Sequence, residues 1–213
     1  MRPRLTLLIT LSSLAAQGTI IDRTAIIVGN HVIKDSDIDR DIQVTSFLNN
    51  EQPNFGPSSR KQAANRLIDQ ELIREEIRSG KYPVAPQSEA DNLLAQIRKQ
   101  RFATDAEYRR ALQQHGITGA ELKDRLAWQL TVLRFIDTRF RPAVVVSDDE
   151  IQQYYNAHRA ELHRAHPDAK GLEDLKPEIE QTIAGEKVNK LLDEWLDQTR
   201  KQTRIEYLEK SLQ

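Results

Sequence analysis

Two short apolar runs separated by a turn predict a β-hairpin near the start of the chain. The β-branched run 24–28 (TAIIV) is followed by Gly29 and Asn30, and the apolar pattern resumes at 32–33. Such runs joined by a two-residue turn with glycine are typical of a hairpin. The run 204–208 (RIEYL) predicts another strand, and its pairing with the hairpin would tie the two ends of the fold together.

Apolar residues at steps of three and four predict helices over most of the remaining chain. The capping pair Ser36 and Asp39 marks the first helix, which is expected to stop before Pro53. Gly80 stands where a left-handed cap would end the second helix. A third helix is expected over residues 88–100.

Three capping boxes, each with glutamate three positions after serine or threonine, mark helix starts at Thr104, Thr118 and Ser147. Gly116 is expected to close the first of these helices. The second must end before Pro142. It is expected to bury one continuous apolar stripe, formed by Leu122, Leu126, Leu130, Leu133, Ile136 and Phe140.

The last third of the chain predicts one long helix after an aperiodic stretch. Residues 143–146 are expected to be extended, and residues 161–171 to form a connector. The final helix contains Pro177, expected in its first turn, where proline is tolerated. Together these elements predict a mainly α, multi-helix domain with a short amino-terminal hairpin and a carboxyl-terminal strand.

The composition of the chain limits the kinds of binding partner and of chemical site that the protein can have. The chain has 213 residues, 38% hydrophobic and 30% charged, which is typical of soluble proteins with long helices. A net charge of −1 supplies no general attraction to nucleic acid. The absence of cysteine excludes disulfides, thiolate nucleophiles and cysteine-ligated metals.

The amino terminus has the layout of a secretory signal peptide. Arg2 and Arg4 precede the charge-free apolar run 5–14, and small residues follow, so that cleavage is expected after Ala15 or Gly18. A ten-residue run is too short to cross a bilayer, which needs about 20 residues. We therefore expect a periplasmic protein without stable membrane insertion.

Motifs for catalysis or cofactor binding are missing from the sequence. His158, His163 and His166 lie close together, but their spacing matches no standard metal site, and solvated positions are the favoured interpretation. His31 follows a turn and is expected at the surface. The sequence has no glycine-rich phosphate loop and no serine-hydrolase elbow, so no catalytic residue, cofactor or metal is assigned.

Several segments, in the same order, resemble the SurA-type periplasmic chaperones. Residues 26–38 are similar to the opening of that family, although the usual Asn-Gly turn is inverted to Gly-Asn here. The segment 66–73 (RLIDQELI) resembles the family's second helix. Further similarity lies at 146–155, which leads into a parvulin-type prolyl isomerase domain in the family, and at the segments that resume after it, 175–180, 194–196 and 204–207.

The departure from the family lies where the isomerase domain would be inserted. Only sixteen residues separate Tyr155 from Leu172, whereas a folded domain needs at least about 50. The resemblance therefore implies a chaperone module without the isomerase insert. The expected division is a signal peptide at 1–18, a helical core at 19–160, the connector 161–171 and a final helix and strand at 172–213.

The function implied by the resemblance is ATP-independent holding of unfolded envelope proteins, including outer-membrane proteins. Apolar and aromatic client segments would bind to uncovered apolar side chains, for which Phe47, Phe55 and Phe102 are candidates because they fall near helix ends or loops. The large rings at 128, 135, 140, 154, 155 and 195 are expected in the core. Two alternatives remain open: a residual or partner-dependent prolyl isomerase, and a structural helical module that forms a homodimer.

Overall fold

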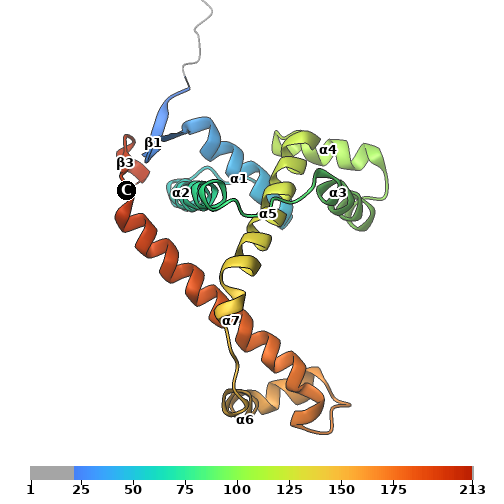
Figure 1. The fold of residues 1–213 in the computed structure, drawn as a ribbon. Coiled ribbons are helices and arrows are strands. Elements are labelled where there is room, and N and C mark those ends of the chain that lie inside the picture. Colours follow the sequence, from blue (N-terminus) through green and yellow to red (C-terminus); the bar gives the residue numbers. More distant parts are fainter. Residues whose placement is uncertain (1–21, 213) are drawn as a thin grey trace, which may run out of the picture.

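The computed structural model describes residues 22–212. In this part of the chain, seven α-helices accompany a small antiparallel sheet (Figure 1), which confirms the predicted mainly α fold. The predicted signal peptide lies outside the described residues. The helices are α1 (Asp35–Asn49), α2 (Pro57–Gly80), α3 (Gln87–Arg101), α4 (Asp105–His115), α5 (Gly119–Arg139), α6 (Asp148–Ala165) and α7 (Leu172–Gln202), with short 3-10 turns η1 (Arg141–Ala143) and η2 (Lys210–Leu212).

The sheet joins the two ends of the described chain, as predicted. Strand β1 (Thr24–Val28) lies between β2 (His31–Lys34) and β3 (Ile205–Tyr207), and both pairings are antiparallel. Gly29 in the β1–β2 turn has φ of 58°, which glycine adopts without steric cost. Its N–H donates to Arg204 O at 2.8 Å, so the same turn also holds the approach to β3.

The sheet packs on α1 and α2 and forms the first of three apolar clusters in the main part of the molecule. Ile26, Ile38 and Ile68 are fully buried there, and Leu212 of η2 joins them. A second cluster around Phe47 is enclosed by α1, α3, α4 and α5. The third surrounds Phe135 of α5 and reaches α2 and α7. We call this part of the molecule, residues 22–143 and 188–212, the body.

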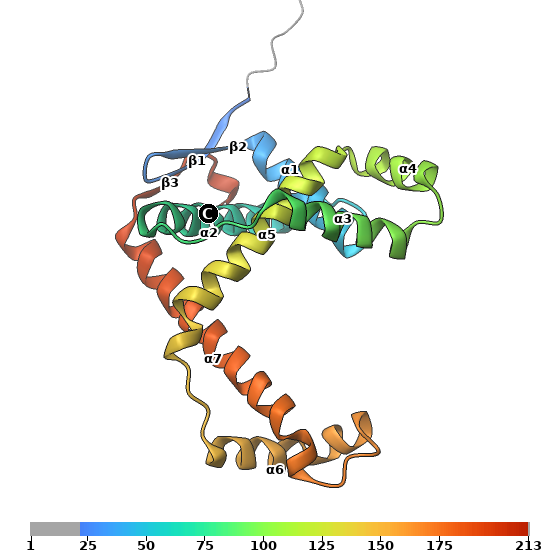
Figure 2. The ribbon, with the colours of Figure 1, turned by 45° about the vertical axis from the view of Figure 1, so that its right-hand side comes forward.

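Helix α6 and the first half of α7, residues 147–184, project from the body as an arm (Figure 2). They have their own apolar cluster, in which Ile151 and Tyr155 of α6 pack against Leu175, Ile179 and Ile183 of α7. Two segments connect the arm to the body: the chain that follows η1, and the continuous helix α7.

Local capping determines many helix ends. The hydroxyls of Thr118 and Ser147 each accept a hydrogen bond from the N–H three residues later. Their own backbone N–H groups donate to the side chains of Glu121 and Glu150, which confirms both capping boxes. Thr104 also caps its helix, although Glu107 accepts from Ala103 N instead. Gly116 closes α4 in the left-handed conformation, as predicted.

Two expectations at the ends of α1 and α2 are wrong. Ser36 is not the N-cap of α1, because its hydroxyl donates to Asp22 at 2.6 Å and the helix already begins at Asp35. Gly80 is the last residue of α2, and Lys81 adopts the left-handed conformation instead. The glycine is still needed there, because a Cβ would lie 2.4 Å from the ring of Tyr82.

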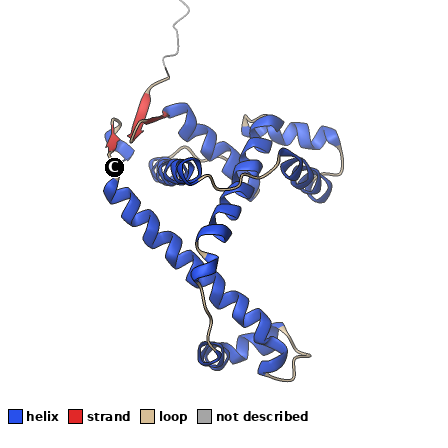
Figure 3. Ribbon diagram, in the orientation of Figure 1, coloured by secondary structure: helices blue, strands red, loops and turns tan. Residues whose placement is uncertain are grey.

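Four expectations in the second half of the chain also need correction. Residues 161–165 continue α6, so that the connector is confined to 166–171 (Figure 3). Pro177 lies inside α7, in the second turn and not the first, because the helix begins at Leu172. Leu133 is exposed, because α5 turns the side with Thr131 and Phe135 toward the core and Leu133 lies on another side. The segment 143–146 is part 3-10 turn, part extended.

Candidate functional site

The three phenylalanines proposed as client contacts differ in exposure. Phe55 is 46% exposed in the loop between α1 and α2. Phe47 is only 1% exposed, so the expected partial exposure is wrong: the rings of Phe102, Tyr108 and His115 pack around it. Phe102 is half-buried and stacks on Phe47 with ring centroids 6.1 Å apart. The structure does not bring the three residues together into one groove.

Three cavities instead meet around the carboxyl-terminal half of α2. Glu71 lines the first and second, Arg78 the first and third, and Arg74 the second and third. Their spacing of three, four and seven residues places these side chains on one side of the helix. We call the surface formed by the three cavities the α2 surface.

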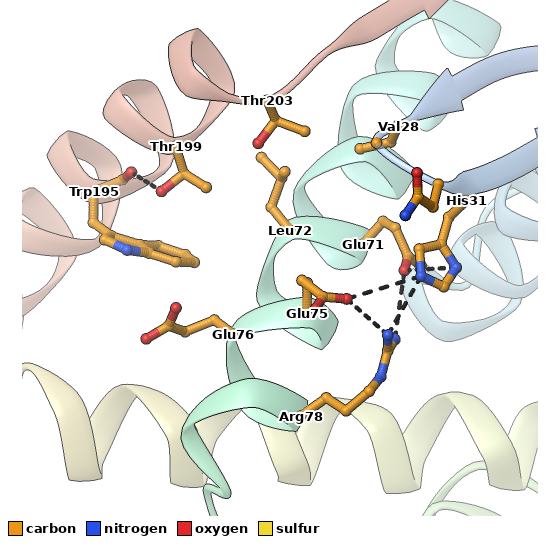
Figure 4. Close-up of a pocket in the computed structure, with 12 residues that line it drawn as sticks. Val28, His31, Glu71, Leu72, Glu75, Glu76, Arg78, Trp195, Thr199 and Thr203 are labelled. Atoms are coloured by element: carbon orange, nitrogen blue, oxygen red, sulfur yellow. Dashed lines mark hydrogen bonds and ion pairs between the residues drawn. The ribbon is translucent and has the colours of Figure 1, made fainter.

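The first cavity, about 390 Å³, lies between the hairpin, α2 and α7, and we call it the hairpin cavity (Figure 4). Trp195 and Leu72 provide its apolar walls, and Thr199 and Thr203 lie along its α7 side. The hydroxyl of Thr199 donates to Trp195 O at 2.7 Å. This hydrogen bond satisfies the hydroxyl within α7, so the side of the cavity near Trp195 is largely apolar.

The opposite wall of the hairpin cavity is charged. His31 Nδ1 lies 3.2 Å from Glu71 Oε1, and Arg78 Nη1 donates to Glu75 Oε2 at 2.7 Å (Figure 4). Glu71 Oε1 is buried and has no hydrogen bond of good geometry among the described residues. Glu76 faces the cavity beside Trp195 and pairs with Arg139 at 2.6 Å. Glu71 and Glu75 therefore share the wall opposite Trp195 with one arginine and one histidine, and Glu76 adds a carboxylate on the Trp195 side.

The second cavity, about 340 Å³, lies between β2, α1, α2 and α5, and we call it the central cavity. Asp41 on its floor is 1% exposed and binds both Arg66, at 2.6 Å, and Arg125. Burial raises the pKa of Glu121, but hydrogen bonds from Thr118 and the charge of Arg40 outweigh it, so that the pKa lies below its ordinary value. The charged groups on the floor are thus mutually compensated.

The third cavity, about 600 Å³, lies between α2, the α2–α3 loop and α5. We call it the tryptophan cavity, because the half-buried indole of Trp128 lines it. The Arg74 guanidinium lies over this ring, 4.6 Å from its centroid. Val84 in the loop is 64% exposed, and Ala85 N donates to the Thr131 hydroxyl at 3.1 Å, which fixes the loop against α5.

Sequence reasoning did not identify this site. Trp128 was expected in the core, and Arg74 and Val84 carried no local motif. The two side chains that stack, Arg74 and Trp128, come from α2 and α5, and nothing in either helix alone indicates their contact. The exposed Val84 beside two prolines was the one available signal, because an apolar residue in a loop has no obvious core to join.

The three clustered histidines have separate partners. His163 lies 3.1 Å from the Tyr155 hydroxyl, His158 pairs with Glu161 at 3.3 Å, and His166 pairs with Glu178 at 3.0 Å. Over residues 22–212 the structure contains no group of three or more histidine, cysteine or acidic residues arranged to hold a metal. Nor does any helix within 22–212 have the length and apolar character that a membrane span requires.

The chain is similar to a foldase. It is 30% identical over 149 residues to foldase protein PrsA of Clostridium acetobutylicum. The similarity covers 63% of this chain and 44% of that protein, so the chain matches less than half of the foldase. No family model matches the chain. This similarity and the SurA-type resemblance of the sequence agree on one point: both relate the chain to proteins that act in protein folding.

Proposed function

We propose that this chain is an ATP-independent chaperone that holds unfolded polypeptide segments on its α2 surface. The observation that carries the proposal is the contiguity of the three cavities around Glu71, Arg74 and Arg78. An extended segment places alternate side chains on one face, so these side chains can enter neighbouring cavities without the segment folding. The similarity to a foldase supports a role in protein folding, and the proposal adds the surface and the mode of action.

The apolar walls of these cavities supply the free energy of binding. Burial of apolar surface contributes about 25 cal/mol per Å², from which the costs of association and of ordering the client are subtracted. Open cavities with a few tryptophan, valine and leucine side chains suit micromolar affinity, about −8 kcal/mol. Binding of this strength lowers the concentration of free unfolded chains and still permits release to a downstream acceptor.

The proposed location and clients follow from the amino-terminal sequence. The basic start and the apolar run 5–14 support export, and hence a periplasmic protein that acts on envelope or outer-membrane proteins. Unfolded β-rich chains expose strand edges that aggregate, so they gain most from such a holdase. The sequence offers no nucleotide-binding loop, which supports action without ATP.

The proposal is tested by light scattering. A β-barrel protein unfolded in urea is diluted into buffer with or without this chain, in the absence of nucleotide, and aggregation is followed over time. The chain is expected to slow the rise in scattering at near-stoichiometric ratios. Equal rates with and without the chain would refute the holdase function.

A matched pair of variants assigns the activity to the α2 surface. Val84→Glu places a charge in the tryptophan cavity, whereas Val145→Glu changes a valine that is 77% exposed and lines none of the three cavities. Both positions are exposed, so both variants are expected to fold. Val84→Glu should weaken the suppression of aggregation several-fold, and Val145→Glu should leave it unchanged.

A further inference from the structure

The tryptophan cavity differs from its two neighbours in having no acidic residue in its lining. Three glutamates line the hairpin cavity together with Arg78, and five acidic residues line the central cavity together with three arginines. The tryptophan cavity is lined by Arg74 and Arg78 and by no aspartate or glutamate. Its remaining walls are mainly apolar, so it combines an apolar floor with positive charge. We therefore expect this cavity to bind client side chains of a different charge than its two neighbours bind.

Arg74 is the arginine with free binding capacity in this cavity. Arg78 already donates to Glu75 at 2.7 Å, whereas no carboxylate of the described residues lies within ion-pair distance of Arg74. Arg74 is exposed, and its guanidinium carbon instead lies over the Trp128 ring, 4.6 Å from the ring centroid. A guanidinium that lies over an aromatic ring still has N–H groups available, and its planar fork matches the two oxygens of a carboxylate.

The apolar part of the cavity lies directly beside this cation. Ile77 and Ala127 are buried at its base, and the exposed Val84 forms its outer wall next to the Tyr82 ring. The volume of about 600 Å³ lies in the range of ordinary ligand pockets. A large apolar side chain can therefore enter next to the indole while a carboxylate from the same segment reaches Arg74.

We propose that the tryptophan cavity binds client segments in which a large apolar side chain and an acidic side chain are two residues apart. In an extended chain such residues point to the same side, so both can face the cavity together. The inference rests on the proposed holdase function and adds the client chemistry that this cavity recognises. Arg74 supplies the preference for acidic segments, and Trp128 with Val84 supplies the apolar contact.

The test measures the binding of three labelled nonapeptides to the full chain by fluorescence anisotropy. The first has a phenylalanine two residues before a central glutamate, with serine and glycine elsewhere, and the other two replace the glutamate by glutamine or lysine. The glutamate peptide is expected to bind about tenfold more tightly than the lysine peptide, with glutamine between them. Added salt should reduce this difference. Equal binding of all three peptides would overturn the proposal.

Variants at Arg74 test whether this residue causes the preference for the glutamate peptide. Arg74→Glu should reverse the order of the glutamate and lysine peptides, and Arg74→Lys should retain the order with weaker discrimination, because lysine lacks the planar fork. The control is Arg109→Glu, which reverses another exposed arginine, on α4, that lines none of the three cavities. It should leave the order intact. If Arg74→Glu keeps the wild-type order, the inference is wrong.

Trp128 provides a second readout that does not depend on the label. The chain has two tryptophans, so Trp195→Phe leaves Trp128 as the single indole reporter. The glutamate peptide should shift its emission, and the Arg74→Glu background should lose that shift. Failure of the inference remains distinct from failure of the proposed function: a wild-type chain that slows aggregation but shows no peptide preference refutes only the inference.

Discussion

The body and the arm are both helical, but their cores are assembled in different ways. The cluster beneath the sheet in the body collects residues from Ala25 to Leu212, so it needs both ends of the described chain. The arm cluster collects residues 146–183 only. A core built from neighbouring helices needs little loop closure, whereas the body must bring distant segments together. The core of the arm therefore forms from segments close in sequence, whereas the folding of the body requires distant segments to come together at once.

The two regions also differ in their use of charge. Asp41 is buried in the body and joins three helices through Arg66 of α2 and Arg125 of α5. In the arm, Lys176 binds Asp148 at 2.7 Å, and where the arm joins the body Lys187 binds Glu150 at 2.6 Å; all four side chains are about a third or more exposed. Buried pairs are costly to break, while exposed pairs contribute little. Charge thus determines the arrangement of the body more than that of the arm.

One matched pair of cavity mutations tests whether the arm is a separate unit. Ile68→Ala in the body and Ile179→Ala in the arm remove the same atoms from sites that are 0% and 1% exposed. Each should cost about 4 kcal/mol locally. Urea denaturation and hydrogen exchange should show global destabilisation for Ile68→Ala, and faster exchange confined to residues 147–184 for Ile179→Ala. Equal loss of protection in α2 and the sheet after Ile179→Ala would mean that body and arm unfold as one.

A second pair measures the buried charge of the body. Asp41→Asn leaves Arg66 and Arg125 without their shared carboxylate and should lower the free energy of unfolding by about 3 kcal/mol. Asp91→Asn is the control, because Asp91 pairs with Lys123 at 2.6 Å but is 54% exposed. The control should cost less than about 1 kcal/mol. Similar losses for both variants in urea titrations would argue against a special role of Asp41.

A third pair replaces two glycines by alanine, and the two substitutions are expected to change stability in opposite directions. Gly29→Ala puts a Cβ on a residue with φ of 58° and should destabilise the body by about 1 kcal/mol. Gly185 lies within α7, where the arm joins the body, and a Cβ there has no heavy atom within 4 Å. Gly185→Ala should stabilise that helix by up to about 1 kcal/mol. Differential scanning calorimetry should show Tm shifts in opposite directions.

The smallest effect concerns pH and the attachment of the arm. Hydrogen bonds from Lys187 and Ser147 lower the pKa of Glu150 from 4.5 to about 2. The contribution of this carboxylate is thus complete above pH 4.5 and is lost as the pH falls toward 2. NMR titration of the Glu150 carboxyl should show the low pKa, and Lys187→Ala should raise it. A normal pKa in the wild-type chain would contradict the pairing.

Local chemistry explains which parts of the fold were predictable. The caps at Thr118 and Ser147 and the left-handed Gly116 depend on residues within a few positions, so the sequence alone specifies them. The hairpin turn at Gly29 is equally local. By contrast, Phe47 is buried because α3 and α4 fold over the end of α1, and its position near a helix end gave no sign of this.

The candidate site could not be predicted from the sequence for the same reason, because it also depends on contacts between distant helices. The periodicity of α5 placed Trp128 near the apolar stripe, but whether its ring is covered depends on how α2 crosses α5. Arg74 is an ordinary polar residue of α2 until the two helices meet. Exposure of apolar side chains is a property of the packed molecule, and single-element patterns do not encode it.

The amino-acid sequence by itself determined the helices, most of their ends and the hairpin, because capping, turn and periodicity act over a few residues. It also indicated the strand at 205–207, but the pairing of this strand with the hairpin joins distant segments and depends on the folded body. It also determined that no full isomerase domain fits between Tyr155 and Leu172. Only the tertiary structure decided that an arm leaves the body and that three cavities meet on α2. The physical reason is that cavities and uncovered rings arise from the crossing of distant helices, whose geometry depends on packing across the whole core.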